Sequence, residues 1–225
     1  MKVCLLDIDG TLVRTGGAGQ VAFAETFDAL FDVGQISSDV SFAGRSDKAI
    51  ACDLMRHHGV EPSTDNWVAF QTKYVELLGP ALARCKGQVL PGVTDLLDQL
   101  VAQGDVLIGL LTGNIIRAAH LKLTHYRLWE RFAFGGFGDH FEDRNDIAAT
   151  AVVEAKKRFT GEANGKSTVV VIGDTPNDIR CARSVGAKAV AVPTGGSSAA
   201  ALRSCGPDLL IDTLEDHDTI LKWFF

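Results

Sequence analysis

A buried strand that ends in two aspartates constrains this chain more than any other stretch. Residues 3–11 read VCLLDIDGT, an apolar run that leads into Asp7 and Asp9. Consecutive apolar residues are typical of a strand buried on both faces, as in parallel sheets covered by helices. In an extended backbone both carboxylates point the same way, beyond the strand's carboxyl end, where α/β sheets bind ligands. The stretch predicts a ligand site; the alternative, an Asp-Gly hairpin turn, lacks an alternating partner strand.

Composition and charge narrow the classes of protein. The 225 residues are 46% hydrophobic, enough for one large domain or for a core with an insertion. The formal net charge of −6 leaves no basic excess to neutralise phosphates, so we expect no nucleic-acid partner. No stretch approaches a membrane span, and we expect no membrane partner. Five scattered cysteines without a Cys-x-x-Cys pair indicate reduced thiols in a cytoplasmic protein.

The pattern of elements changes twice along the chain. After the first strand, residues 16–19 (GGAG) form a flexible joint, and no convincing strand interrupts residues 16–88. Helical patterns cover 20–31, 46–59 and a segment that starts after residue 63 and runs to residue 80 or beyond. We therefore predict a separate helical insertion at residues 16–88, within a core formed by residues 1–15 and 89–225.

Strands and helices then alternate to the end of the chain. Strand patterns fall at 106–111, 132–137, 168–172, 189–192 and 208–211, with helical patterns at 93–101, 115–125, 145–159, 176–185 and 214–223. This alternation predicts an α/β fold with a doubly wound parallel sheet. Residues 161–167 (GEANGKS) imitate a nucleotide-binding loop, but they precede a strand and are one residue short, so we interpret them as a turn.

Polar residues follow three of the predicted strands. Besides Asp7 and Asp9, residues 112–114 (TGN) follow the strand at 106–111, and residues 173–178 (GDTPND) follow the strand at 168–172. Carboxylates gathered at one sheet edge repel one another unless a cation is present, and hard divalent ions prefer oxygen ligands. We predict Mg2+, which leaves room for waters and a substrate phosphate when few carboxylates hold it. Phosphoryl chemistry follows from this prediction.

The two aspartates of the last loop differ in how well local structure explains them. Thr175, Pro176 and Asp178 have the spacing of a helical capping box, which is a structural alternative for Asp178. Asp174 precedes that box and is not explained by it.

These motifs, in this order, resemble the haloacid dehalogenase-like hydrolase superfamily: DIDGT at 7–11, LTGN at 111–114 and GDTPND at 173–178. The likeness covers the whole chain. It implies a Rossmann-like core with a helical cap inserted between the first and second motifs, where the insertion is predicted. Residues 44–47 (GRSD) also resemble the substrate-facing cap loop of phosphoglycolate phosphatase-like members.

The resemblance implies a role for each motif residue. Asp7 would be the nucleophile that forms an aspartyl-phosphate, Asp9 the acid and base, and Thr112 a holder of the transferring phosphoryl group. The metal would be bound by Asp7, the Asp9 carbonyl and Asp174, supported by Asp178. Further contacts with the substrate would come from Gly10, Thr11, Gly113, Asn114 and Arg45.

One motif departs from the family pattern. The family usually has a lysine just before the helix that precedes the last acidic loop, whereas residues 141–146 here read FEDRND. We predict that Arg144 supplies this charge as a planar fork. The alternative is an exposed arginine in the first turn of a helix.

The predicted function is a magnesium-dependent phosphatase of a small phosphorylated metabolite, acting as a monomer or homodimer. A phosphosugar mutase would keep the same carboxylates and is the main alternative. A phosphonate hydrolase would need a placed cap lysine, and Lys48, Lys73 and Lys86 have no clear placement. A non-catalytic sensor would be expected to lose Asp7 or Asp9, and dehalogenases lack the second aspartate.

Overall fold

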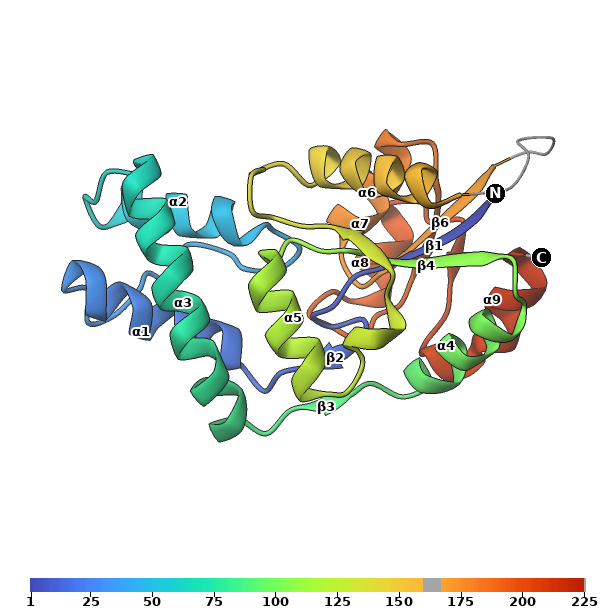
Figure 1. Cartoon of the computed structure of the whole chain (residues 1–225), viewed down its shortest axis with the longest axis horizontal. Coiled ribbons are helices and arrows are strands. Elements are labelled where there is room, and N and C mark those ends of the chain that lie inside the picture. The colour runs from blue at the N-terminus through green and yellow to red at the C-terminus, as the bar shows by residue number, and fades with distance from the viewer. Residues whose placement is uncertain (160–166, 225) are drawn as a thin grey trace.

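A six-stranded parallel sheet forms the centre of the molecule in the computed structural model, which describes residues 1–159 and 167–224. The strand order is β5-β4-β1-β6-β7-β8 (Figure 1). The strands are β1 (Lys2–Leu6), β4 (Val106–Leu111), β5 (Phe134–Gly136), β6 (Thr168–Gly173), β7 (Lys188–Ala191) and β8 (Leu209–Leu210). Leu6 of β1 pairs with Leu110 of β4 and Ile172 of β6, so these three strands end almost level.

Helices cover both faces of the sheet, as the alternation predicts (Figure 1). Cys4 and Leu6 of β1 face a cluster that includes side chains of α4 (Val93–Ala102), α5 (Ile116–His125) and α9 (His217–Phe224). Val3 and Leu5 face the opposite cluster, which contains residues of α6 (Arg144–Arg158), α7 (Pro176–Ser184) and α8 (Ala199–Ser204). The doubly wound, Rossmann-like α/β class is confirmed.

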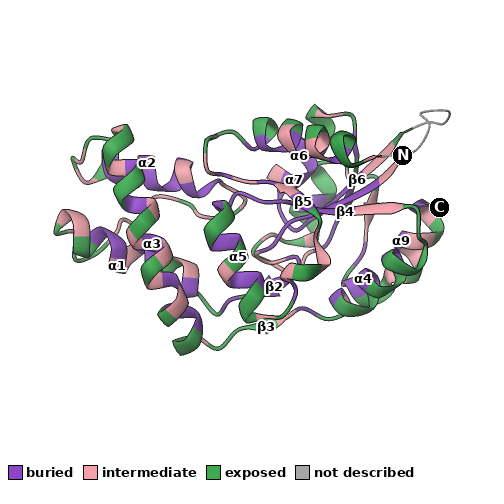
Figure 2. Cartoon of the chain, viewed as in Figure 1, coloured by how far each residue is buried: buried purple, intermediate pink, exposed green. Residues whose placement is uncertain are grey.

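Three helices form a separate apolar cluster: α1 (Ala18–Phe31), α2 (Asp47–His57) and α3 (Thr64–Arg84). Its centre is aromatic, because the ring of Phe23 lies 4.8 Å from Phe70 and 4.7 Å from Tyr74, measured between centroids. Buried and exposed residues alternate along α1 and α3 in Figure 2, as expected for amphipathic helices. The cluster also includes Ile115 and Ala118, so these helices rest on the α5 region of the core.

Two short strands differ from the sequence expectation. β2 (Val13–Arg14) and β3 (Gln88–Val89) pair antiparallel where the chain leaves and re-enters the core, although no strand was predicted there. Two residues are too few to show a period of two, so pairing across distant sequence defines these strands. β5 is also shorter than the predicted segment 132–137.

Two further findings concern the rest of the chain. Except for residue 167, the predicted turn at 161–167 lies outside the described residues. Within residues 1–159 and 167–224, no helix combines the length and apolar character needed to cross a membrane.

Candidate active site

Three buried carboxylates meet at the carboxyl edge of the sheet. Asp7 follows β1, Asp174 follows β6, and Asp178 lies in the first turn of α7; one oxygen from each lies within 4.8 Å of the others. Burial raises the pKa of Asp7 to about 7, with Arg144 opposing the rise. Burial raises the pKa of Asp174 to about 8, and its carboxylate neighbours add to that rise. The cluster is therefore strained electrostatically in the absence of further positive charge.

Arg144 lies inside this cluster and is only 7% exposed, so an exposed helical arginine is not what the structure shows. Its Nη2 donates to Asp7 Oδ1 at 3.2 Å and to Asp178 Oδ1. The first turn of α6 holds the side chain there, because the Asp143 carboxylate caps that helix by accepting from the Asn145 N–H. The arginine thus occupies the region predicted for the family lysine.

Asp178 both caps a helix and belongs to the carboxylate cluster, the two roles that the sequence predicts for it. Its Oδ2 accepts from the Thr175 N–H at 2.9 Å, which is the side-chain contact of a capping box, and also from Thr175 Oγ1 at 2.7 Å. Its other oxygen, Oδ1, accepts from Arg144. One carboxylate therefore fixes the loop and also belongs to the charged cluster.

The donor set fits a divalent cation. Three carboxylates and one guanidinium leave two formal negative charges in a buried site. Carboxylate oxygens are the ligands that Mg2+ prefers, and its charge equals the uncompensated charge. Glycine is required beside Asp174, since a Cβ on Gly195 would lie 1.7 Å from Asp174 Oδ2 and one on Gly10 would lie 2.6 Å away.

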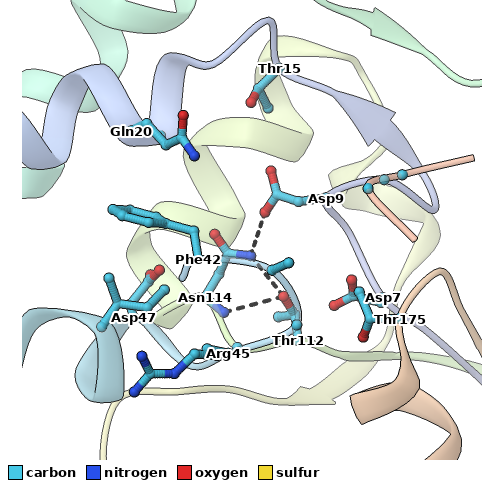
Figure 3. Close-up of a pocket in the computed structure, with 18 of the residues that line it drawn as sticks. Asp7, Asp9, Thr15, Gln20, Phe42, Arg45, Asp47, Thr112, Asn114 and Thr175 are labelled. Atoms are coloured by element: carbon cyan, nitrogen blue, oxygen red, sulfur yellow. Dashed lines mark hydrogen bonds between the residues drawn. The ribbon is translucent and has the colours of Figure 1, made fainter. Parts of the chain in front are cut away.

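Asp9 belongs to a second polar network. Its Oδ2 accepts from Lys122 Nζ at 2.6 Å and from Asn114 Nδ2 at 2.8 Å. Lys122 also donates to Asn114 Oδ1 at 2.6 Å. Asn114 donates to Thr112 Oγ1 at 2.8 Å, and Figure 3 shows its contacts with Asp9 and Thr112. The network ties the Asp9 carboxylate to the loop that follows β4.

The sequence did not lead us to select Lys122. Its side chain is buried in the structure, with only 5% of its surface exposed. It lies one turn after Ala118, on the buried face of α5. A charged residue on the apolar face of an amphipathic helix was the signal that could have identified it.

A cavity of about 410 Å³ is lined by members of both networks and extends between the core and the helices α1–α3. Core residues that line it include Asp7, Asp9, Gly10, Thr112, Gly113, Asn114, Lys122, Arg144 and Asp174. From the helical part come Gln20, Phe23, Phe42, Arg45, Asp47, Ile50 and Tyr74. Thr11, predicted to contact the substrate, is instead fully buried and donates to Asp174 Oδ1 at 3.2 Å.

The loop at residues 44–47 joins the helical part to the core. The Asp47 N–H donates to the Gly113 carbonyl at 2.7 Å, and Asn177 Nδ2 donates to the Gly44 carbonyl at 2.6 Å. Gly113 is required at this contact, because a Cβ there would lie 2.1 Å from the Arg45 carbonyl oxygen. The loop therefore packs against the backbone of the second motif and against the Asn177 side chain of the last motif.

Arg45 and Asp47, neighbours in this loop, are placed differently. The Arg45 guanidinium, predicted to face the substrate, pairs with Asp53 Oδ2 at 2.6 Å and points away from Asp7 in Figure 3. Asp47, which the sequence analysis did not select, is buried and accepts from the Ile115 N–H at 2.9 Å. Burial raises the pKa of Asp47 to about 7, opposed by the charge of Lys122.

Comparisons with known proteins agree with this geometry. Residues 146–217 match a family model described as HAD-hydrolase-like. The chain is 26% identical to a phosphoglycolate phosphatase of Synechococcus elongatus over 96% of this chain and 95% of that protein. A hydrolase from Pseudomonas syringae has a TM-score of 0.74 at 20% identity, covering 99% of each chain. CbbY from Rhodobacter sphaeroides in complex with phosphate has a TM-score of 0.74 at 20% identity, covering 96% of each chain.

The order of the motifs, the fold and these matches confirm the predicted resemblance. The chain is thus similar to haloacid dehalogenase-like hydrolases, by the family model over residues 146–217 and by its phosphoglycolate phosphatase relative over nearly its whole length. The chain is a phosphatase, a hydrolase of phosphoric monoesters.

Proposed function

We propose that this phosphatase requires Mg2+ and hydrolyses small phosphorylated metabolites through an aspartyl-phosphate at Asp7. The carrying observation is the position of Asp7, which follows the central strand and lines the 410 Å³ cavity beside two further buried carboxylates. The Asp9 carboxylate, held by Lys122 and Asn114, lines the same cavity. A nucleophile and a proton carrier are thus both available to one bound phosphomonoester.

The chemistry proceeds in two transfers. An Asp7 oxygen attacks phosphorus while the bond to the leaving oxygen breaks, and Asp9 gives its proton to that oxygen. Asp9 then takes a proton from a water molecule, whose oxygen attacks the phosphorus and releases inorganic phosphate and free Asp7.

Other residues of the site support both transfers. Thr112 and Arg144 donate hydrogen bonds to the phosphoryl oxygens. Asp7, the Asp9 carbonyl and Asp174 would hold Mg2+, with Asp178 in support, and the bound ion would supply charge neutralisation.

We further propose that residues 16–88 act as a cap on a core formed by residues 1–15 and 89–225. The paired strands β2 and β3 connect the two parts, and the loop at 44–47 closes the cavity over Asp7. Such a cap excludes water during the first transfer and admits it for the second. The five free cysteines support a cytoplasmic location, where thiols stay reduced.

Phosphate release from a panel of sugar phosphates, nucleotides and phosphoglycolate tests the proposal. We expect turnover that chelation abolishes and Mg2+ restores, whereas Ca2+, with its larger and more variable coordination, supports little. Isomer analysis of the same reactions distinguishes the mutase alternative, which would yield a rearranged sugar phosphate in place of free phosphate. Full activity after exhaustive chelation would contradict the metal requirement.

A further inference from the structure

The end of the cavity that lies away from Asp7 is formed by the helical part and differs chemically from the phosphoryl end. In Figure 3, Gln20, Phe42 and Asp47 lie on one side and Asp7 on the other, with Asp9 between them. The leaving group of a phosphomonoester attached at Asp7 must extend past Asp9 toward this end. The residues there therefore determine which leaving groups fit.

Aromatic side chains form much of this wall. The ring of Phe23 packs edge-on against Phe42 at 5.1 Å and Tyr74 at 4.7 Å between centroids, and Ile50 lies beside them in the lining. Such a wall favours an organic leaving group with some apolar surface. The cavity of about 410 Å³ must also hold the phosphoryl group, so this leaving group is metabolite-sized.

Two of the three cations near this end are already paired with carboxylates of the described residues. Lys122 Nζ is held by Asp9 at 2.6 Å, and the Arg45 guanidinium by Asp53 at 2.6 Å. Arg14 is exposed in β2, at the connection between the two parts, where it donates to a backbone carbonyl. Lys122 and Arg45 therefore offer a second anionic group of the substrate no unpaired charge, and Arg14 lies at the connection between the two parts.

Asp47 supplies the opposite charge at this end. Its Oδ2 accepts from the Ile115 N–H at 2.9 Å, while its Oδ1 has no donor among residues 1–159 and 167–224. The residue is buried and lines the cavity. A hydroxyl or amide N–H on the leaving group would satisfy the free oxygen, whereas a carboxylate or second phosphate would be repelled by it.

We propose that the site selects phosphomonoesters whose leaving group is uncharged and offers a hydrogen-bond donor to Asp47, and that it disfavours leaving groups with a second negative charge. The inference rests on the proposed phosphatase function and adds the substrate class. Asp47 is the specificity-determining residue, and it discriminates by charge.

A matched pair of substrates tests the charge rule. Phosphoglycolate and its amide, phosphoglycolamide, have the same number of non-hydrogen atoms but differ by one negative charge, and phenyl phosphate reports basal activity. On the alkaline side of the Asp47 pKa, we expect kcat/KM to be higher for the amide by roughly tenfold or more. Equal or better hydrolysis of phosphoglycolate would overturn the inference while the phosphatase proposal stands. Loss of all three activities, phenyl phosphate included, would overturn the phosphatase proposal itself.

A pair of variants tests the assignment to Asp47. Asp47→Asn should bring the amide-to-acid ratio close to one, mainly by improving phosphoglycolate. Asp139→Asn is the matched control, because Asp139 accepts from the adjacent Ile116 N–H at 2.8 Å but does not line the cavity. The control should keep the ratio of the unmodified enzyme. If both variants leave the ratio unchanged, Asp47 does not set the specificity. If Asp47→Asn fails to fold, the two substrates still test the charge rule on the unmodified enzyme.

Discussion

The two ends of the cavity are built in different ways. At the phosphoryl end, Asp7, Thr112 and Asp174 follow β1, β4 and β6, whose pairing fixes their backbones relative to one another. At the helical end, Asp47 and Tyr74 come from α2 and α3, whose positions depend on side-chain packing and on the contact with Gly113. Reaction chemistry is thus supported by strand register, while substrate choice depends on how helices pack.

The two ends of the cavity should respond differently to mutation. Residues at the phosphoryl end contact atoms that change charge during the reaction, so their loss should lower kcat. Residues at the helical end contact a leaving group that changes little, so their loss should alter the choice among substrates.

The largest expected effect belongs to Asp7→Asn. An amide cannot attack phosphorus, so we expect kcat to fall by about 10⁵-fold, as for other nucleophile replacements. Steady-state phosphate release measures the loss, and Asp212→Asn at an exposed site serves as the control. An active Asp7→Asn enzyme would contradict a covalent mechanism at Asp7.

Arg144→Ala should come next. Losing one preorganised cationic donor beside Asp7 and Asp178 costs about 3 kcal/mol of transition-state stabilisation, or roughly 10²-fold in kcat. Arg158→Ala, at the exposed end of the same helix, should leave kcat unchanged. A rate for Arg144→Ala within twofold of the unmodified enzyme would assign Arg144 to structure alone.

Lys122→Met should have a smaller effect that appears mainly in the second transfer. Without Lys122 the Asp9 carboxylate loses a charged donor at 2.6 Å, a contact worth about 1.5–3 kcal/mol. Rapid-quench kinetics with an aryl phosphate should show slower hydrolysis of the phosphoenzyme, and Lys122→Arg should partly restore it. Lys156→Met, at an exposed site, is the control. A Lys122→Met enzyme with equally slowed formation and hydrolysis of the phosphoenzyme would indicate a general loss of structure.

Arg45→Ala should have the smallest effect. Its guanidinium pairs with the partly exposed Asp53, and such pairs contribute about 1 kcal/mol or less to stability. We expect kcat/KM within about threefold of the unmodified value for every member of the substrate panel. A change of selectivity that Asp53→Ala does not share would show instead that Arg45 contacts the substrate.

The fold and the phosphoryl end were accessible from the sequence for a shared physical reason. Buried parallel strands are continuous apolar runs, and the residues that follow them must meet at one edge of the sheet. Asp7, Asp174 and Asp178 could therefore be grouped before any coordinates were known. Arg144 could be selected because it stands near the place where the family usually has a lysine.

The helical end was not accessible in the same way. Asp47 and Lys122 face the cavity because of helix packing and rotation, which local spacing does not specify. Arg45 was selected from a loop motif, but its guanidinium pairs with Asp53. The carboxylate buried in the cavity wall belongs to Asp47, two residues further along the chain. The strands β2 and β3 were missed because two residues carry no detectable period.

Trapping the covalent intermediate tests whether Asp7 is the nucleophile. In Asp9→Asn the first transfer from an activated aryl phosphate needs no proton, but water activation in the second transfer lacks its base. We predict a burst of about one leaving group per enzyme, followed by slow turnover, with the phosphoryl group located on Asp7 by mass spectrometry after acid quench. Steady turnover without a burst, or a phosphoryl group on another residue, would contradict the account.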